Sequence, residues 1–310
     1  MQRKEYRFFL CVFLTITTIA AAGCRSTATL ERFQTFADAG THYTTTVGNL
    51  LSDSNASGLP ILLVDANSVR LLESRQLAPV SEADFHQQDE DMRKQLLTLR
   101  LLKHEVDLLG QYFSALASLA GSTASTDIAQ QLGDIGSSLS GLASTLGDTN
   151  KLATDSSAVS TVASGAGKIV VKGVQAHLLR KELETRGAAI AMILRQQATM
   201  LAALTEQAER AQGFLNQQSY QQNVVAPFLA GTTSANWEQE RQAGLLQMPI
   251  PESLEAAVQA ANSLRIAWTT LLADELDSAE LDAVRRPLTT IDALRDDSST
   301  SASGKERKAP

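Results

Sequence analysis

Apolar positions recur along most of this chain in alternating steps of three and four residues, which is the period of an amphipathic α-helix. The first stripe predicts a helix from Thr27 to about Asp53. It passes through Phe33, Ala37, Gly40, Thr44, Val47 and Leu51. A polar turn at residues 54–58 ends it, and Pro60 suits the first turn of a second helix that reaches about Leu77. The interior positions expected in this second helix are Leu62, Val69 and Leu72.

The clearest periodic signal predicts a long helix from about residue 82 to residue 120. Its apolar face comprises Met92, Leu96, Leu99, Leu102, Val106, Leu109, Phe113, Leu116 and Ala120. No proline interrupts this face, and the sequence from Ser81 to Asp84 is typical of a helix N-cap. Since a helix rises about 1.5 Å per residue, this element would be roughly 58 Å long.

A fourth helix is expected after Gly121. Its stripe contains Ile128, Leu132, Ile135, Leu139, Leu142 and Leu146. Glycines at 133, 136, 141 and 147 lower its intrinsic helicity, so we expect it to depend on a neighbour that approaches closely. A second long helix is then predicted over residues 158–215. Its face comprises Val159, Val162, Ala166, Ile169, Gly173, Ala176, Arg180, Leu183, Gly187, Ile190 and Leu194, with Arg180 as the interruption.

The last third of the chain predicts two more helices. Pro227 and Gly231 suggest a break, near which Trp237 is expected to cover the core. The next helix follows Pro249 and Pro251 and ends at about Leu276. Its expected face is Leu254, Val258, Ala261, Leu264, Trp268 and Leu271.

The final helix is expected to begin at a cap formed by residues 277–280. Its apolar positions are Leu281, Val284, Leu288, Ile291 and Leu294. Pro287 should kink or split this helix because proline has no backbone donor. Residues 297–310 are rich in Ser and Lys and are expected to form a disordered tail.

These elements predict an all-α fold, an elongated antiparallel bundle of about six helices with two of them long, in one domain over residues 24–296. Composition agrees with helix, because 44% of residues are hydrophobic but only 5% are aromatic, and Leu and Ala supply most of the apolar content. A chain of this length can bury a substantial core.

The first residues have the pattern of a signal peptide. Arg3, Lys4 and Arg7 precede an uncharged apolar stretch from Phe8 to Ala22. This stretch is shorter than the about 20 apolar residues that a membrane-spanning helix needs. We therefore expect residues 1–23 to be cleaved, and Cys11 to be lost with them.

The sequence Ala21-Ala22-Gly23-Cys24 resembles the lipobox of bacterial lipoprotein precursors, although the commonest lipobox has Leu in place of Ala21. The resemblance covers only about 26 residues. It implies that Cys24 carries covalent lipid, and that Arg25, where inner-membrane lipoproteins have Asp, directs the protein to the outer membrane facing the periplasm. An ordinary secretory leader with a cysteine near its cleavage site is the alternative.

Charge and residue usage exclude several classes of activity. The formal net charge of −7 becomes more negative without the basic leader, so the chain lacks the basic footprint of a nucleic-acid-binding protein. Four histidines, and one cysteine besides that of the leader, predict neither a metal site nor a disulfide framework. We expect no cofactor other than the lipid on Cys24.

Two motifs resemble catalytic or binding signatures but lack required residues. The segment from Ser164 to Ile169 has no glycine at Val162 and no Ser or Thr after Lys168, as a phosphate-binding loop requires. His104 and Glu105 begin a zinc-protease signature, but Leu108 stands where the second histidine is needed.

The other candidate polar residues have simpler interpretations. His42, His86 and His177 lack ligand spacing and are expected at the surface or packed. An acidic cluster of Asp84, Asp89, Glu90 and Asp91 suits a solvated helix N-terminus, with a weak cation site as the alternative. Arg180 is expected to pack its stem and extend its head into water.

The sequence therefore predicts a non-enzymatic, membrane-anchored envelope protein whose helical faces bind another envelope protein. The first alternative is a membrane-perturbing protein, because the Gly- and Ala-rich segment 158–179 resembles the inserting parts of helical pore-forming toxins. Lys168 and Lys172 weigh against that alternative, since charge at mid-membrane is costly. An enzyme or small-ligand carrier is the third possibility and would require an apolar cavity with converging polar groups.

Overall fold

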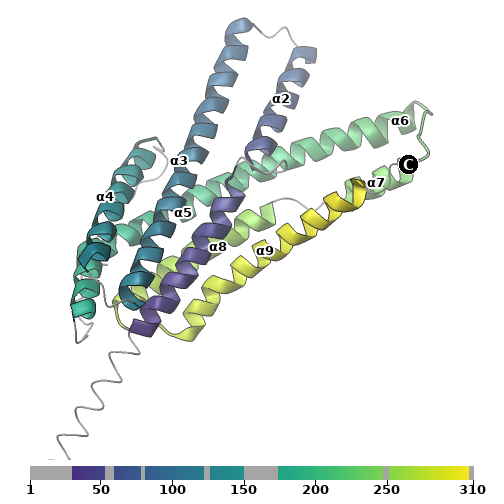
Figure 1. Cartoon of the computed structure of the whole chain (residues 1–310). Helices are drawn as coiled ribbons and strands as arrows, with labels where there is room; N and C mark the ends of the chain where they lie inside the picture. The colour runs from purple at the N-terminus through teal and green to yellow at the C-terminus, as the bar shows by residue number, and fades with distance from the viewer. Residues whose placement is uncertain are drawn as a thin grey trace, which may run out of the picture.

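A computed structural model describes residues 30–52, 59–77, 81–121, 126–149, 174–246 and 251–306, and these residues are helical apart from short turns, with no β-strand among them (Figure 1). The first helix covers residues 30–50. The others are α2 (Leu59–Leu77), α3 (Glu82–Gly121), α4 (Thr126–Thr149), α5 (Val174–Tyr220), α6 (Ala226–Leu229), α7 (Trp237–Leu246), α8 (Pro251–Leu272) and α9 (Ser278–Glu306). The all-helical prediction is confirmed for this part of the chain, but a count of about six helices is not.

Helix 30–50 lies at the centre of the assembly and contacts four others. Phe36 packs edge-on against Phe113 of α3 at 5.6 Å between ring centroids, and against Trp268 of α8 at 5.4 Å. Tyr43 reaches α5, and His42 pairs with Asp292 of α9 at 3.1 Å. All six positions of its predicted stripe are buried. The first helix after the predicted anchor therefore contributes one whole face to the core.

The long helix α3 lies where the sequence placed it, and its N-cap is confirmed. The Asp84 amide donates to Ser81 Oγ at 3.1 Å, which satisfies a free donor of the first turn. The predicted face is buried from Leu99 to Ala120, whereas Met92 and Leu96 are only half-buried. The N-terminal third of α3 projects beyond the other helices alongside the free end of α2, whereas the rest of α2 packs on α5 (Figure 1).

The interior face expected for α2 is wrong in part. Leu72 is 61% exposed and Val69 is half-buried, while the buried side chains are Leu59, Leu62, Leu63 and Ala66. Apolar residues occur all around α2, so the period alone could not identify the packed face. Its distal half is held by Arg70, whose guanidinium lies 5.1 Å from the ring centre of Phe214 on α5.

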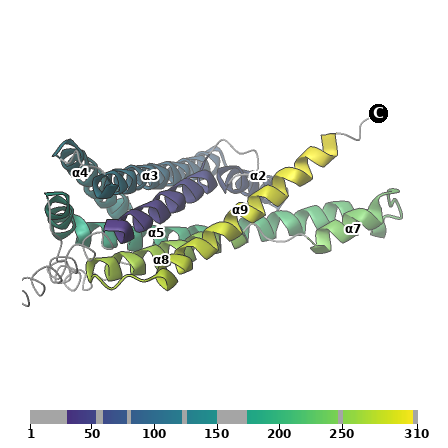
Figure 2. The same ribbon diagram turned by 60° about the horizontal axis from the view of Figure 1, so that its bottom comes forward.

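The longest element, α5, spans most of the molecule (Figures 1 and 2). It passes Tyr220 and continues through a π-helix, η3 (Gln221–Val225), into α6, so the helix does not end at residue 215. Pro227 lies just after this π-helix, so its missing donor falls inside a continuous helical run and not at a free helix N-terminus. The break comes at Gly231, whose φ is +67°. The portion of the predicted helix before Val174 lies outside the described residues.

Glycines allow the close approaches that the sequence predicted for α4. A Cβ on Gly136 would lie 2.4 Å from Cδ of Arg186 on α5, and one on Gly133 would lie 3.2 Å from its guanidinium. Gly141 faces open space. On α5, the Trp268 indole donates to the Gly187 carbonyl at 2.8 Å, which fixes the crossing of α5 and α8.

In the turn between α8 and α9, the end of α8 differs from the prediction, whereas the N-cap of α9 agrees with it. α8 ends at Leu272 and not near Leu276, because Asp274 adopts a φ of 60°. The Glu275 amide then donates to the Thr270 carbonyl at 2.9 Å, which completes a Schellman motif. The predicted cap of α9 is confirmed, since Ala279 and Glu280 amides bind Asp277 Oδ1 and the Asp277 amide binds Glu280 Oε2.

α9 is one helix through Pro287, so the predicted split is wrong. Proline removes a single hydrogen bond, and its buried neighbours Val284 and Leu288 hold both halves against the core. The helix backbone continues to Glu306, through most of the segment expected as a disordered tail. No proline or glycine lies between Pro287 and Gly304 to end it.

Candidate functional site

Charged and hydroxyl side chains are buried along the seam where α3 packs against α5. Glu105 and Tyr112 lie on α3, Gln197 and Glu182 lie on α5, and Tyr43 reaches them from helix 30–50. All five are buried. We call this set the buried polar seam.

Glu105 is the most unusual member of the seam. It is fully buried, and neither of its carboxylate oxygens has a hydrogen-bond partner at good geometry. Burial raises the pKa of Glu105 to about 8, although the neighbouring Gln197 amide lowers it in part. The folded protein therefore holds this carboxyl group mostly protonated at neutral pH.

Gln197 connects Glu105 to helix 30–50. The Tyr43 hydroxyl donates to Gln197 Oε1 at 3.0 Å, and the pKa of Tyr43 is raised far above its usual value, first by burial and then by Glu105. Tyr43 is therefore a hydrogen-bond donor and not an acid in this environment. The three side chains tie helix 30–50, α3 and α5 together.

Glu182 and Arg186 form an ion pair one helical turn apart on α5, with Tyr112 beside them. Burial is the main cause that raises the pKa of Glu182, and Arg186 opposes it. Burial also raises the pKa of Tyr112, followed by the charge of Glu182. Because Arg186 also packs over Gly133 and Gly136, the pair positions α4 against α5.

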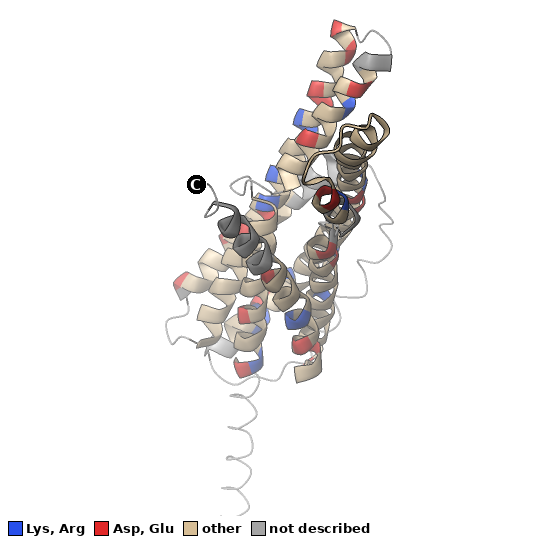
Figure 3. Ribbon diagram, turned by 90° about the vertical axis from the view of Figure 1, so that its right-hand side faces the viewer, with Lys and Arg blue, Asp and Glu red and all other residues tan. Residues whose placement is uncertain are grey.

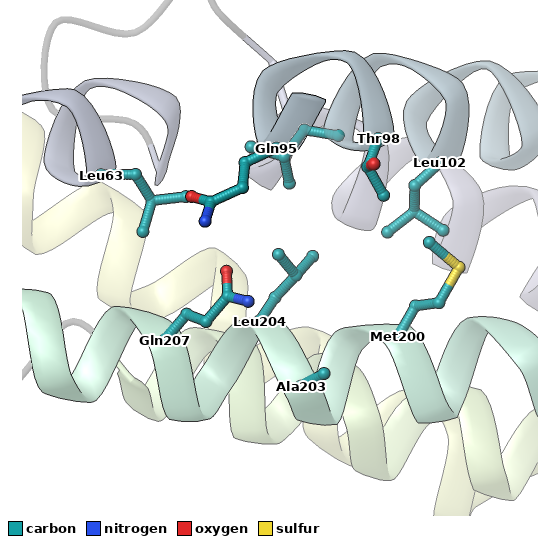
Figure 4. Close-up of a pocket in the computed structure, with 9 residues that line it drawn as sticks. Leu63, Gln95, Thr98, Leu102, Met200, Ala203, Leu204 and Gln207 are labelled. Atoms are coloured by element: carbon teal, nitrogen blue, oxygen red, sulfur yellow. The ribbon is translucent and has the colours of Figure 1, made fainter. Parts of the chain in front are cut away.

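A small cleft lies one helical turn from Glu105, between α2, α3 and α5 (Figure 4). Its volume is about 130 Å³, and its walls are mostly apolar. Gln95 and Gln207 point toward each other across it, while Leu102 and Met200 line its far end (Figure 4). Ligand pockets for drug-sized molecules have volumes of about 300–1,000 Å³, so this cleft suits only a small group.

The seam does not have the arrangement of an active site. A general base must reach solvent or substrate, but Glu105, Gln197 and Tyr43 are enclosed by side chains of three helices. No group of three His, Cys, Asp or Glu side chains among the described residues could hold a metal ion. The chemistry available to the seam is hydrogen bonding between helices and proton exchange at its two buried carboxyl groups, Glu105 and Glu182.

The structure separates the residues that the sequence singled out as candidates. His42 pairs with Asp292, His86 lies 3.6 Å from Glu82, and His177 is exposed. Arg180 is part-exposed and its Nε donates to Glu184 at 2.7 Å, as expected for a surface arginine. In the acidic cluster, Glu90 and Asp91 pair with Lys94 at 3.2 and 3.5 Å, which agrees with a solvated helix face.

Other sequence candidates cannot be placed. Cys24, the segment Ser164 to Ile169 and most of 158–179 lie outside the described residues. Within the described part, the helix from His177 to Leu229 is long and apolar enough to cross a membrane by length and composition alone. Half of its most apolar window is buried against other helices, however, which is typical of a core helix.

Sequence reasoning missed Glu105 as a core residue. It treated Glu105 only as part of a failed zinc motif, although Glu105 lies on the apolar face between Leu102 and Leu109. Gln197 similarly lies between Leu194 and Leu201, both fully buried. A polar residue inside an otherwise apolar stripe was the available signal.

Comparison with known proteins gives no match to any family model, curated protein or solved structure.

Proposed function

We propose that this chain is a bacterial envelope lipoprotein that holds a rigid, non-enzymatic helical module at its membrane. After removal of residues 1–23, Cys24 carries the lipid, and Arg25 favours the outer membrane facing the periplasm. More than one acyl chain is needed for stable attachment, and the lipobox resemblance implies several chains. The module is an elongated antiparallel helical bundle that binds another envelope protein.

The observation that carries the proposal is the position of helix 30–50. The described part of this helix starts at Leu30, six residues after Cys24, and it packs against α3, α5, α8 and α9. So short a connection leaves little freedom between lipid and bundle, and any force on the anchor passes to the core. This arrangement suits a protein that must keep its surface at a defined place.

One further observation supports a module without catalytic activity. The buried titratable groups Glu105 and Glu182 are used between helices, where a substrate has no access. A separate observation supports the antiparallel arrangement. Leu102 of α3 lies near Met200 of α5, and Glu105 lies near Gln197, so residue numbers increase along α3 in the direction in which they decrease along α5.

The test is a Cys24→Ala variant of the full chain expressed in a bacterial host. We expect the wild-type protein to gain the mass of lipid and to fractionate with membranes, and the variant to lose both properties. A Cys11→Ala variant is the matched control and should behave as the wild type. Unchanged lipidation in Cys24→Ala would show that Cys24 is not the anchor.

The interaction part of the proposal requires a second measurement. Crosslinking the tethered protein in cells should capture a reproducible envelope protein that is absent from the Cys24→Ala sample. Reproducible turnover of a defined substrate by the purified protein would contradict a non-enzymatic role.

A further inference from the structure

The end of the molecule formed by η3, α6 and the turn before α7, residues 221–237, differs from the rest of the surface. We call it the α6–α7 tip. Phe228 and Leu229 are 61% and 78% exposed, which are large values for apolar side chains of this size. Phe228 also stacks on Trp237, with ring centroids 5.5 Å apart and planes 22° apart. The tip therefore presents a small aromatic and aliphatic platform to its surroundings.

The tip lacks charge, in contrast to the surface elsewhere. Charged residues make up 20% of the chain, yet none lies between Arg210 and Glu238, and no histidine lies there either. Figure 3 views the molecule from this end and shows the tip without the red and blue that mark the free ends of α2 and α3. Residues 221–237 can enter a lipid headgroup region without desolvating a charge of their own, provided that the exposed Glu238 and Glu240 of α7 stay on the water side.

Polar groups beside Phe228 and Trp237 are satisfied within the tip, whereas the amides of residues 233–236 are exposed to solvent. The Trp237 indole donates to the Val224 carbonyl at 2.8 Å, and the Thr232 amide donates to the Pro227 carbonyl at 2.9 Å. The amides of Ala230 and Gly231 bind carbonyls of α6. Because unsatisfied backbone groups are costly in lipid, this pairing favours a shallow contact through Phe228, Leu229 and Trp237, with residues 233–236 kept in water.

From these observations we propose that the α6–α7 tip is a membrane-interface contact in which Phe228, Leu229 and Trp237 enter the headgroup level of a bilayer. Aromatic side chains with one satisfied polar atom are favoured at that depth. Two exposed side chains cover far less than the about 800 Å² that a stable protein interface buries on each partner. A shallow lipid contact needs no such area.

The tip contact is separate from the predicted lipid on Cys24. Helix 30–50 begins at the end of the molecule opposite α6 (Figures 1 and 2), and the tip lies roughly 60 Å along α5 from Gly187 at 1.5 Å per residue. The inference therefore stands whether or not Cys24 carries lipid.

The chain provides its own reporter for a test. Its two tryptophans are Trp237 at the tip and Trp268, which is fully buried in the core. The full chain with Cys24→Ala is mixed with phosphatidylcholine vesicles whose acyl chains carry bromine, a contact quencher of tryptophan. We expect quenching and a blue shift of Trp237 emission. The effect should also occur in vesicles containing phosphatidylglycerol and should be insensitive to salt, because the tip is uncharged.

Variants assign the signal to the tip. Phe228→Ser with Leu229→Ser should weaken partitioning measured through Trp237 by at least about tenfold. Leu72→Ser with Ile266→Ser is the matched control, because these side chains are 61% and 48% exposed elsewhere, and it should leave quenching unchanged. Trp237→Phe should abolish it. All replaced side chains except Trp237 are exposed, so circular dichroism should report an unchanged fold.

Three results would overturn the proposal. They are an unquenched Trp237 in both kinds of vesicle, quenching that survives in the Phe228/Leu229 variant, and quenching that survives in Trp237→Phe. If Trp237 stays unquenched while tip residues crosslink to a protein in cells, the tip binds protein and not lipid. Lipidation of Cys24 is measured by mass in a different experiment. Failure of the proposed lipid anchor can therefore be distinguished from failure of the proposed membrane contact of the α6–α7 tip.

Discussion

The hydroxyl of Tyr43 donates a 3.0 Å hydrogen bond to Oε1 of Gln197, a residue 154 positions later in the chain. Both side chains are fully buried, and the Gln197 amide faces the otherwise unpartnered Glu105. A polar link of this kind gives helix 30–50 a defined rotation and register against α5, which apolar packing alone specifies less sharply.

Replacing Tyr43 by Phe should destabilise the protein by about 1–3 kcal/mol, because Gln197 Oε1 is then buried without a donor. Adding Gln197→Met should cost less than the sum of the two single variants, since both partners of the bond are then absent. Urea denaturation of the four proteins measures this. Tyr220→Phe, at a half-buried position on α5, is the control and should change the free energy of unfolding by less than about 0.5 kcal/mol. If the double variant lost as much stability as the two single variants together, the proposed coupling between Tyr43 and Gln197 would be contradicted.

Glu105→Gln tests the protonated state of the buried carboxyl group. The pKa of Glu105 is raised to about 8 in the folded protein, above its usual 4.5. The unfolded chain therefore releases this proton at lower pH than the folded chain, and stability decreases as pH rises between these values, by about 1.4 kcal/mol per unit from this group. Glu105 contributes its full stabilisation below pH 4.5, and this stabilisation is lost above about pH 8.

The measurement is the free energy of unfolding as a function of pH. Glu105→Gln should remove this downward slope and should be more stable than the wild type near pH 8. Glu206→Gln on α5 is the control, because its side chain is solvent-exposed and should leave the slope unchanged. A wild-type slope that persists in Glu105→Gln would show that another group causes it.

The extent to which sequence predicts this fold depends on the residue type at each position. The stripe from Leu99 to Ala120 gave the correct buried face of α3, because every third or fourth residue is apolar and the opposite face is polar. In α2 the same reasoning selected Leu72, which is exposed, since apolar residues occur on several sides of that helix. Periodicity identifies a packed face only where the other faces are polar.

The buried polar seam was less accessible to sequence reasoning. Glu105 is a polar residue in an apolar stripe and could have been noticed, but its partner Gln197 is supplied by a helix far away in sequence. A single sequence contains no information on which of many glutamines meets it. The exposure of Phe228 and Leu229 was equally hard to predict, because an apolar run beside a proline is as compatible with burial as with exposure.

Two glycine-to-alanine substitutions should have opposite effects. A Cβ on Gly40 would lie 2.5 Å from the fully buried ring of Phe113, so Gly40→Ala should destabilise the protein by about 1–3 kcal/mol through overpacking. Gly141 of α4 has no atom within 4 Å of the added carbon, so Gly141→Ala should stabilise it by up to about 1 kcal/mol through helix propensity. Thermal unfolding of both variants measures the two changes in stability. If both substitutions stabilised the protein, or both destabilised it, the packing described here would be contradicted.

Asp274→Gly should leave stability unchanged or raise it by up to about 1 kcal/mol. Asp274 has a φ of 60° at the end of α8, a conformation that glycine adopts without strain. The substitution also removes an exposed ion pair with Arg32 at 3.7 Å, whose contribution is small. Asp277→Ala, three residues later, is the contrasting variant and should cost about 1 kcal/mol because the N-cap of α9 is lost.

The π-helix at Gln221–Val225 has a consequence for the direction in which the end of the molecule faces. One extra residue in a helical turn rotates everything beyond it by about 100° relative to an uninterrupted α-helix. Phe228 therefore owes its orientation to a single inserted position, and it meets Trp237 at the first residue of α7. Deletion of one residue from Gln221–Val225 would leave the composition and the helix content nearly unchanged. It would nevertheless turn Phe228 and Leu229 toward a different side of the molecule.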